Sequence, residues 1–379
     1  MKITVNLISE ALAWDVKGQG VYTASLSLAE ALKRVPELEV HINGKGLYDI
    51  AHLHTPGPYA ITKGLTTGKR IVISAHVIPE SLIGSLVLSE VWLPIAEKFF
   101  QYYYNLADVI IAVSPKVKSA LEEFKVKAPI YVIPNPINLE RFFVDLEKRE
   151  IMRKRLGFTE DDFVVMSSGQ IQPRKGVDTF IEVAKHLPDI KFLWVGGQPF
   201  SILTAGYLDL QEKIKNAPNN VIFTGIVPYE EMPYYYNASD VLFFPSRQET
   251  FGMVIPEAAS CGLPLLLRDL EEYKDLYKDW YISANSNDEF VMLIKKLKED
   301  KTFYTEYRNK AFQLAEYYNL NNIGREIAKL YKEILDSPPR YNRDLLTLES
   351  FRKEGRKIWK FFKYPKTKNH EKNKSKYYF

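Results

Sequence analysis

The stretch FFPSRQETFGMVIPEAASCGLPLLLRD, residues 243–269, decides the fold of this chain. A short apolar strand at 241–244 leads into a polar loop and then into a brief helix. Pro256 fits the first turn of that helix, where a missing amide proton costs nothing. Gly262 fits the helix exit, and a second apolar strand follows at 265–267. The pattern predicts a strand–loop–helix–strand unit of an α/β protein.

Two carboxylates frame this unit, Glu249 in the loop and Glu257 in the first turn of the helix. Between them, the backbone amides near the start of the helix favour an anion such as a phosphate; they belong to Gly252, Met253 and Val254. A carboxylate beside a phosphate would repel it. We therefore interpret both glutamates as acceptors for neutral hydroxyls on either side of the phosphates, which is the layout of a nucleotide sugar.

The spacing of Glu249 and Glu257 within PSRQETFGMVIPEAASCGLP resembles the signature of retaining glycosyltransferases of the GT-B fold, of the family 4 type. The alternative is an ordinary strand–loop–helix unit that carries two surface glutamates. The resemblance implies an α/β architecture of two Rossmann-like, doubly wound parallel-sheet domains that face a cleft. The segments GQIQPRKGV, WVGG and SCGLPLLLRDL further resemble bacterial 1,2-diacylglycerol glucosyltransferases of glycolipid synthesis.

Length and composition fit this picture. A chain of 379 residues suits two domains, and 46% hydrophobic with 26% charged residues is ordinary for a globular protein. The one cysteine, Cys261, excludes an internal disulfide and any multi-cysteine metal site, and its place at a helix end favours core packing. No apolar run is long enough to span a membrane, and we expect no signal peptide.

In the first part of the chain, strands alternate with helical stretches, which predicts a parallel, doubly wound sheet. Ligands of such sheets bind at the carboxyl ends of the strands, where His54 and His76 fall. By resemblance, His76 matches the histidine near the transferred sugar. The strands are expected at 3–8, 49–54, 70–76, 109–114 and 130–135.

A glycine loop with Gly18 and Gly20 separates the first strand from a helix, so that backbone can approach a ligand closely. In the glycosyltransferase interpretation this loop faces the donor phosphates, and the alternative for Gly18 is a tight turn. Residues 79–108 are rich in large apolar and aromatic side chains. They predict either a core-facing helix pair or an acceptor-side surface that dips into a bilayer.

The second part opens after a charged stretch, Asp145 to Arg155, that we interpret as a linker. A strand, a loop with Gly169 and a helix follow, and Arg174 and Lys175 precede the helix. Cations placed there neutralise a pyrophosphate; the alternative is a solvated basic turn.

The family commonly has a basic residue after the first glycine of this loop, and Gln170 stands there. This departure leaves the diphosphate to Arg174 and Lys175. The resemblance also implies that the backbone of Gly225, Ile226 and Val227 lies against the nucleotide base.

The C-terminal tail, residues 337–379, has 13 basic and 4 acidic residues, whereas the rest of the chain is mildly acidic. Within 344–363 an apolar, aromatic stripe and a basic stripe predict a basic amphipathic helix suited to an anionic membrane face. A helix docked on the chain's own first domain is the alternative. No recognition module accompanies the charge, so we expect no nucleic acid partner.

These observations lead to one interpretation, a retaining hexosyltransferase. It would move glucose from UDP-glucose onto diacylglycerol or monoglucosyl-diacylglycerol, with Glu257 on the ribose, Glu249 on the hexose, Arg174 and Lys175 on the diphosphate, and His76 beside the acceptor. We expect no metal ion or cofactor, and a cytoplasmic protein bound peripherally to the inner face of the cell membrane. The expected parts are 1–148 (acceptor side), 149–318 (nucleotide sugar), 319–336 (crossover helix) and 337–379 (tail).

Two other functions remain open. One is a glycosyltransferase for a polyprenyl-linked or soluble glycan. The other is a non-catalytic module that binds a nucleotide sugar and associates with membranes.

Overall fold

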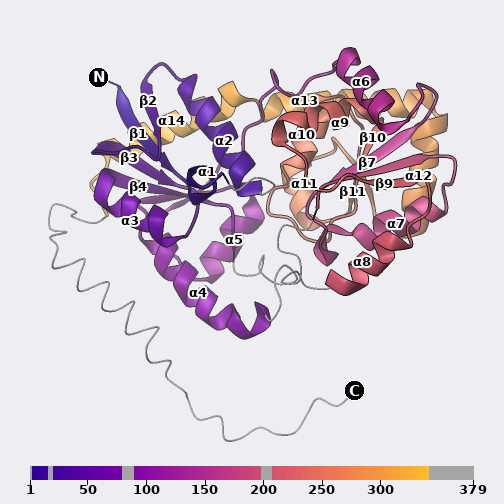
Figure 1. Ribbon diagram of the computed structural model, residues 1–379. Helices are drawn as coiled ribbons and strands as arrows, with labels where there is room; N and C mark the ends of the chain where they lie inside the picture. The colour runs from indigo at the N-terminus through magenta and orange to yellow at the C-terminus, as the bar shows by residue number, and fades with distance from the viewer. Residues whose placement is uncertain (1, 16–19, 79–88, 198–206, 341–379) are drawn as a thin grey trace, which may run out of the picture. The chain divides into compact units, whose positions relative to one another are not determined.

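A computed structural model describes residues 2–15, 20–78, 89–197 and 207–340 (Figure 1). Within these residues the first sheet has six strands, all parallel, in the order β2-β1-β3-β4-β5-β6. Its strands are β1 Ile3–Ile8, β2 Leu38–Ile42, β3 Tyr48–Leu53, β4 Gly68–Ala75, β5 Val109–Ala112 and β6 Ile130–Val132. The accompanying helices are α1 Glu10–Ala13, α2 Gly20–Lys33, α3 Pro58–Thr67, α4 Ser89–Asn105 and α5 Pro115–Glu123.

The second sheet, again of six parallel strands in the described residues, has the order β12-β11-β10-β7-β8-β9. Its strands are β7 Val164–Ser168, β8 Lys191–Val195, β9 Val221–Phe223, β10 Val241–Phe244, β11 Leu265–Arg268 and β12 Ile282–Ala284. The helices are α6 Leu146–Leu156, α7 Val177–Lys185, α8 Tyr207–Lys215, α9 Met232–Ala238, α10 Val254–Ser260, α11 Glu271–Tyr277, α12 Asn287–Glu299 and α13 Lys301–Tyr317, with 3-10 turns η2 Pro173–Lys175 and η4 Tyr229–Glu231.

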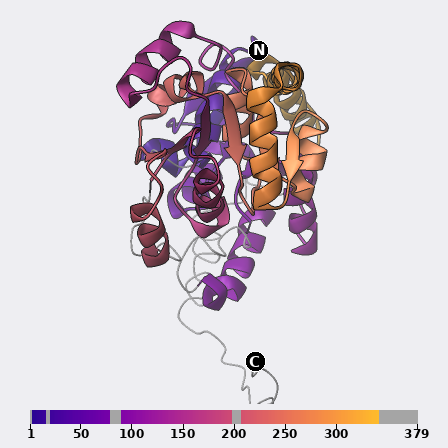
Figure 2. The same cartoon turned by 90° about the vertical axis from the view of Figure 1, so that its right-hand side faces the viewer.

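The predicted fold class, two doubly wound parallel sheets, is confirmed. In both sheets the order reverses direction beside the first strand, and the strands are apolar along their length because helices cover both faces. Figure 2 shows the orange helices of residues 287–317 along the second sheet. There Phe290 and Ile294 of α12 pack with Phe243 and Leu266 of the strands.

The last described helix, α14 Leu320–Asp336, packs against the first sheet rather than the second (Figure 1). Its apolar face, including Ile323, Ile327 and Tyr331, shares a core cluster with β1. Gly324 permits this close approach to α2, since a Cβ there would lie 2.7 Å from the carbonyl oxygen of Ala31.

The chain crosses between the sheets twice, and the two crossings lie side by side. Ile137 forms a parallel bridge with Asn319, and its amide donates to the carbonyl of Tyr318 at 2.8 Å. Residues Met1–Pro338 form one compact unit that contains both sheets. We call residues 2–137 the N-terminal half and residues 138–319 the C-terminal half.

The interpretation of Asp145 to Arg155 as a linker is wrong. These residues form the start and body of α6, with Asp145 as the N-cap and Gly157, at φ 72°, as the left-handed C-cap. Arg153 is 1% exposed and donates to the carbonyls of Ala238 and Asp162 and to the carboxylate of Asp240. The charge of this stretch therefore ties α6 into the C-terminal half.

Three further expectations concern the cysteine, membrane spans and the tail. Cys261 is buried, and burial raises the pKa of its thiol, as core packing requires. Among the described residues, no helix combines the length and apolarity needed to cross a bilayer. The predicted amphipathic helix within 344–363, Gly18 and part of the 79–108 segment lie outside the described residues.

Candidate active site

A cleft of about 540 Å³ lies between the two halves. The N-terminal half contributes Gly20 and Tyr22 at the start of α2 and His76 after β4, so the carboxyl ends of strands face it. Most of the residues predicted from the sequence line this one cleft, although Gly225 does not. They are Gly20, His76, Gly169, Arg174, Lys175, Ile226, Val227, Glu249, Gly252, Met253, Val254 and Glu257.

A buried ion pair stands at the centre of the C-terminal wall. The ammonium of Lys175, whose side chain is 13% exposed, donates to a carboxylate oxygen of Glu249, whose side chain is 7% exposed. Ser246 donates to the same oxygen at 2.7 Å. Burial raises the pKa of Glu249, but the charges of Lys175 and Arg174 outweigh it and hold that pKa below its usual range.

Burial lowers the pKa of Lys175, while Glu249 acts in the opposite direction. We take the pair as ionised, because a carboxylate faced by two cations keeps its charge and in turn holds the proton on Lys175. The pair is neutral as a unit, so the net positive charge of this cluster comes from the neighbouring Arg174.

Local backbone geometry explains the position of Lys175. The residue that follows, Gly176, has φ 74°, and a Cβ there would lie 2.3 Å from the carbonyl oxygen of Pro245. Glycine is therefore required for η2 to pass over the end of β10. That passage brings Lys175 onto the loop of Glu249, 74 residues further along the chain.

A row of amides orients Arg174. Gln172, which is 2% exposed, accepts from Nε of Arg174 at 3.0 Å and donates to the side chain of Gln170 at 2.9 Å. A second guanidinium nitrogen of Arg174 donates to the carbonyl of Gln248 at 3.4 Å. Gln170, in the place where the family commonly has a cation, thus supports Arg174 through Gln172.

Glu257 on α10 is 3% exposed and lines the same cleft. The hydroxyl of Tyr229 donates to one of its oxygens at 3.1 Å, and the hydroxyl of Tyr236 to the other at 2.7 Å. Burial raises the pKa of Glu257 to about 7, and the two tyrosine hydrogen bonds oppose this effect. The carboxyl group therefore titrates near neutral pH.

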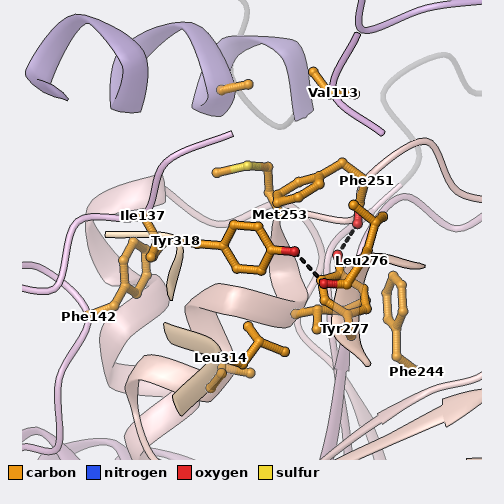
Figure 3. Packing of buried hydrophobic residues seen from close by; sticks show 14 of the residues in the cluster. Val113, Ile137, Phe142, Phe244, Phe251, Met253, Leu276, Tyr277, Leu314 and Tyr318 are labelled. Carbon is orange, nitrogen blue, oxygen red and sulfur yellow. Dashed lines mark hydrogen bonds between the residues drawn. The ribbon is translucent and has the colours of Figure 1, made fainter. Parts of the chain in front are cut away.

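Aromatic residues hold the loop between Glu249 and Glu257 (Figure 3). The hydroxyl of Tyr277 donates to the carbonyl of Phe251, and the hydroxyl of Tyr318 donates to the carbonyl of Leu276. Tyr318 immediately precedes Asn319 at the crossing between the halves. The donor-side loop is thus braced against the crossing.

The N-terminal wall carries a different chemistry. His76 is partly exposed in the cleft, and its Nε2 lies 3.0 Å from Nδ1 of the buried His54. Burial lowers the pKa of His76 to about 4, so its ring is neutral at neutral pH. Within the described residues, no acidic side chain is hydrogen-bonded to either ring.

Sequence reasoning missed Tyr229, Tyr236 and Gln172. The tyrosines lie 28 and 21 residues from Glu257, on η4 and α9, so no local pattern joins them to it. Gln172 had a signal, since a glutamine two residues from an arginine in a phosphate-binding loop can orient it.

In chemical terms, the C-terminal wall can hold an anion at Arg174 and Lys175 and accept hydroxyl donors at Glu249 and Glu257. Within the described residues no group of three or more His, Cys, Asp or Glu side chains is placed to hold a metal ion. The expectation that no metal takes part stays a prediction. The individual roles of the site residues also stay predictions.

Comparison with known proteins gives the class. The family model described as glycosyl transferases group 1 matches residues 148–314, and the model described as Glycosyltransferase Family 4 matches residues 16–141. The alpha-galactosylglucosyldiacylglycerol synthase of Streptococcus pneumoniae is 32% identical and aligns over 84% of this chain and 86% of its own.

The processive diacylglycerol alpha-glucosyltransferase of Acholeplasma laidlawii is 28% identical over 84% of this chain and 95% of its own. The crystal structure of Anabaena HepE in complex with UDP and glucose has a TM-score of 0.69 at 19% identity, covering 87% of this chain and 99% of that one.

The two parallel sheets with this cleft between them have the GT-B fold. The chain belongs to the glycosyltransferases that the group 1 and family 4 models describe. Its homologues include enzymes named for glycolipids built on diacylglycerol.

Proposed function

We propose that this glycosyltransferase moves glucose from UDP-glucose onto diacylglycerol or monoglucosyl-diacylglycerol, at the cytoplasmic surface of the cell membrane and with retention at the anomeric carbon. The observation that carries the proposal is the buried Lys175–Glu249 pair beside Arg174, with Glu257 in the same cleft. Two relatives that align with 84% of the chain are named for diacylglycerol products or acceptors, and both names specify alpha linkages.

The roles follow from charge and burial. Arg174 and Lys175 would hold the diphosphate and stabilise the charge that develops on it, the effect that contributes most to such transfers. Glu249 would accept from a hydroxyl of the hexose, and Glu257 from the ribose hydroxyls. Ile226 and Val227 line the cleft, and the base would lie against them.

In the transfer, the bond between the hexose C1 and the β-phosphate oxygen breaks, and its electron pair leaves with UDP. The acceptor hydroxyl oxygen forms the new bond to C1 on the same face. Its proton passes to the departing phosphate oxygen. The protein would bind, orient and neutralise charge, and we propose that Arg174 and Lys175 supply the cations without a metal ion.

A transfer assay tests this proposal directly. Radiolabelled UDP-glucose, and UDP-galactose in a parallel arm, would be incubated with vesicles that contain diacylglycerol or monoglucosyl-diacylglycerol, with and without EDTA. We expect an alpha-linked, labelled glycolipid from UDP-glucose, with EDTA causing no loss. Label only in a polyprenyl-linked or soluble acceptor would contradict the lipid assignment, and UDP-glucose binding without transfer to any acceptor would contradict the enzymatic one.

We further propose that the basic tail binds the anionic membrane surface. The proposal rests on the excess of 13 basic over 4 acidic residues in 337–379. Deleting residues 344–379 should release the protein from vesicles with anionic lipid while leaving UDP-glucose affinity unchanged, as measured by sedimentation and calorimetry. If vesicle binding survives the deletion, the tail is not the membrane contact, and the 79–108 segment becomes the better candidate.

A further inference from the structure

Three histidines lie together at the ends of two neighbouring strands. His52 is in β3, His54 directly follows it, and His76 follows β4, which pairs with β3. The ring of His54 stacks between the other two, with centroid distances of 4.7 Å to His52 and 5.2 Å to His76. Of the three, His76 lines the cleft.

The hydrogen bonds of the three rings differ. Both nitrogens of His52 are satisfied, Nδ1 at 2.6 Å from the hydroxyl of Tyr331 and Nε2 at 2.8 Å from the hydroxyl of Ser74. His54 is 2% exposed, and its Nε2 has no partner among the described residues. Its Nδ1 lies 3.0 Å from Nε2 of His76, which is the one hydrogen bond found for the His76 ring in the described part of the chain.

Both members of the His54–His76 pair are neutral at neutral pH. Burial lowers the pKa of His76 to about 4, and burial together with the neighbouring histidines holds the pKa of His54 well below its usual range. Two neutral rings carry two ring protons, one on each. One of those protons must lie in the hydrogen bond between them.

Two arrangements satisfy this count. If His76 donates from Nε2, the proton of His54 must sit on its own Nε2, where the described residues offer no acceptor. If His54 donates from Nδ1, its Nε2 is left with a lone pair, and His76 carries its proton on Nδ1. Buried N–H groups without an acceptor are the rarer and costlier case.

We infer that His54 is a positioning residue that donates from Nδ1 to His76 and thereby fixes His76 as an N–H donor toward the cleft. With Nε2 of His76 engaged, Nδ1 is the ring atom left for a ligand. A neutral imidazole in this state offers a proton to an oxygen lone pair and has no free lone pair with which to take a proton from the acceptor hydroxyl.

This inference rests on the proposed transfer and deepens it. His76 lies by resemblance near the transferred sugar, and its fixed tautomer would make it a hydrogen-bond donor to an oxygen of the hexose and exclude it as the general base. The proton of the acceptor hydroxyl then goes to the departing phosphate, as the balance of the proposed step requires.

The tautomer can be measured without any substrate. The protein has six histidines, so two-bond ¹H–¹⁵N spectra of the ¹⁵N-histidine-labelled full chain are tractable, with the His76 signals identified by their loss in His76→Asn. We expect protonation at Nδ1 of His76 and at Nδ1 of His54. Protonation at Nε2 of His76 would overturn the inference.

Variants of His54 test the consequence for transfer. In His54→Asn the amide nitrogen replaces Nδ1 as a donor, so we expect turnover close to that of the wild type. His54→Leu removes the donor, and we expect kcat to fall by about 10²-fold, with UDP affinity unchanged because UDP lacks the hexose. Equal losses in Asn and Leu variants, or a loss of UDP affinity in step with kcat, would mean that His54 acts only through packing.

Tyr331→Phe is the matched control, since it removes a buried hydrogen bond from the neighbouring His52 and leaves the His54–His76 bond in place. It should lower the Tm and keep turnover. The two proposals fail separately: a wild-type protein that transfers no hexose contradicts the function whatever the tautomer, and an active wild type with Nε2-protonated His76 contradicts this inference alone.

Discussion

The two walls of the cleft are built from different kinds of side chain. The C-terminal wall holds ionised groups in buried positions, Lys175 with Glu249, and beside them Glu257 with a pKa near neutrality. The N-terminal wall presents the neutral pair of His54 and His76. In the proposed function, the diphosphate of the donor would lie against Arg174 and Lys175 of the C-terminal wall, and the hexose would lie between Glu249 and His76.

The largest effect is expected from the charged wall. Lys175→Ala removes one of the two cations that we propose to stabilise the developing diphosphate charge, and we expect kcat to fall by about 10²- to 10³-fold in the UDP-glucose transfer assay. Lys185→Ala is the matched control, because Lys185 lies on the outer surface of α7, half exposed, and pairs with Glu182. Near-wild-type turnover in Lys175→Ala would show that Lys175 does not stabilise the diphosphate charge.

Lys175→Ala also leaves Glu249 buried beside a single remaining cation, Arg174. Breaking a buried pair in this way costs about 3 kcal/mol of stability. The double variant Lys175→Met with Glu249→Gln removes both charges and should recover much of that stability, measured as Tm, without recovering kcat. Recovery of both would show that the loss in Lys175→Ala came from misfolding.

A smaller effect, visible in its pH dependence, is expected at Glu257. Its pKa is about 7 in the protein, and both oxygens already accept from Tyr229 and Tyr236. For the ribose hydroxyls that we assign to Glu257, the ionised carboxylate is the stronger acceptor. Binding therefore favours the ionised form. Affinity for UDP, measured by calorimetry, should be constant above pH 7 and weaken by up to roughly tenfold per pH unit below it.

The pH dependence of folding stability has the opposite sign to that of UDP affinity. A carboxyl with a raised pKa binds more protons in the folded than in the unfolded protein, so its contribution to stability is lost as pH rises from the ordinary value of 4.5 to about 7. Glu257→Gln does not titrate, so both its UDP affinity and its Tm should depend less on pH across this window. An unchanged pH profile in this variant would assign the titration to another group.

The charged residues of the C-terminal wall could be predicted from the sequence, but the hydrogen-bond partners within both walls could not. The strand–loop–helix unit at 241–268, with Glu249 and Glu257, follows from turn residues close in sequence. Arg174 and Lys175 were predicted separately, from the glycine loop after β7. The partners of Glu257 come from η4 and α9, and the pairing of His54 with His76 depends on β3 and β4 being neighbours. Such contacts depend on tertiary packing and leave no periodic signal.

The segment 145–155, predicted as a linker, shows a second limit of prediction from the sequence. The α6 sequence LEKREIMRKRL has little apolar periodicity, so its charges suggested an exposed connection. The caps Asp145 and Gly157 were the available helix signals. What holds the helix in place is Arg149 and Arg153 binding Asp240, which lies about ninety residues away and could not be paired with them from sequence.

The smallest expected effect concerns how the walls are held together. Lys116 on α5 of the N-terminal half donates at 2.7 Å to Glu272 on α11 of the C-terminal half, and Glu272 also accepts from the backbone amide of Glu249 at 3.4 Å. Lys116 is 38% exposed, so the pair is worth at most about 1 kcal/mol, and Lys116→Ala should raise the donor KM by no more than about fivefold.

Lys118→Ala provides the control for this last prediction. Lys118 lies two residues away on the same helix and pairs at 3.9 Å with Glu122 within that helix, so it removes the same charge without touching the C-terminal half. If donor binding depends on the Lys116–Glu272 contact between the walls, Lys116→Ala should raise the donor KM and Lys118→Ala should not. The two variants should have the same Tm. Equal KM values in both variants would mean that the C-terminal wall binds the donor independently of the contact between Lys116 and Glu272.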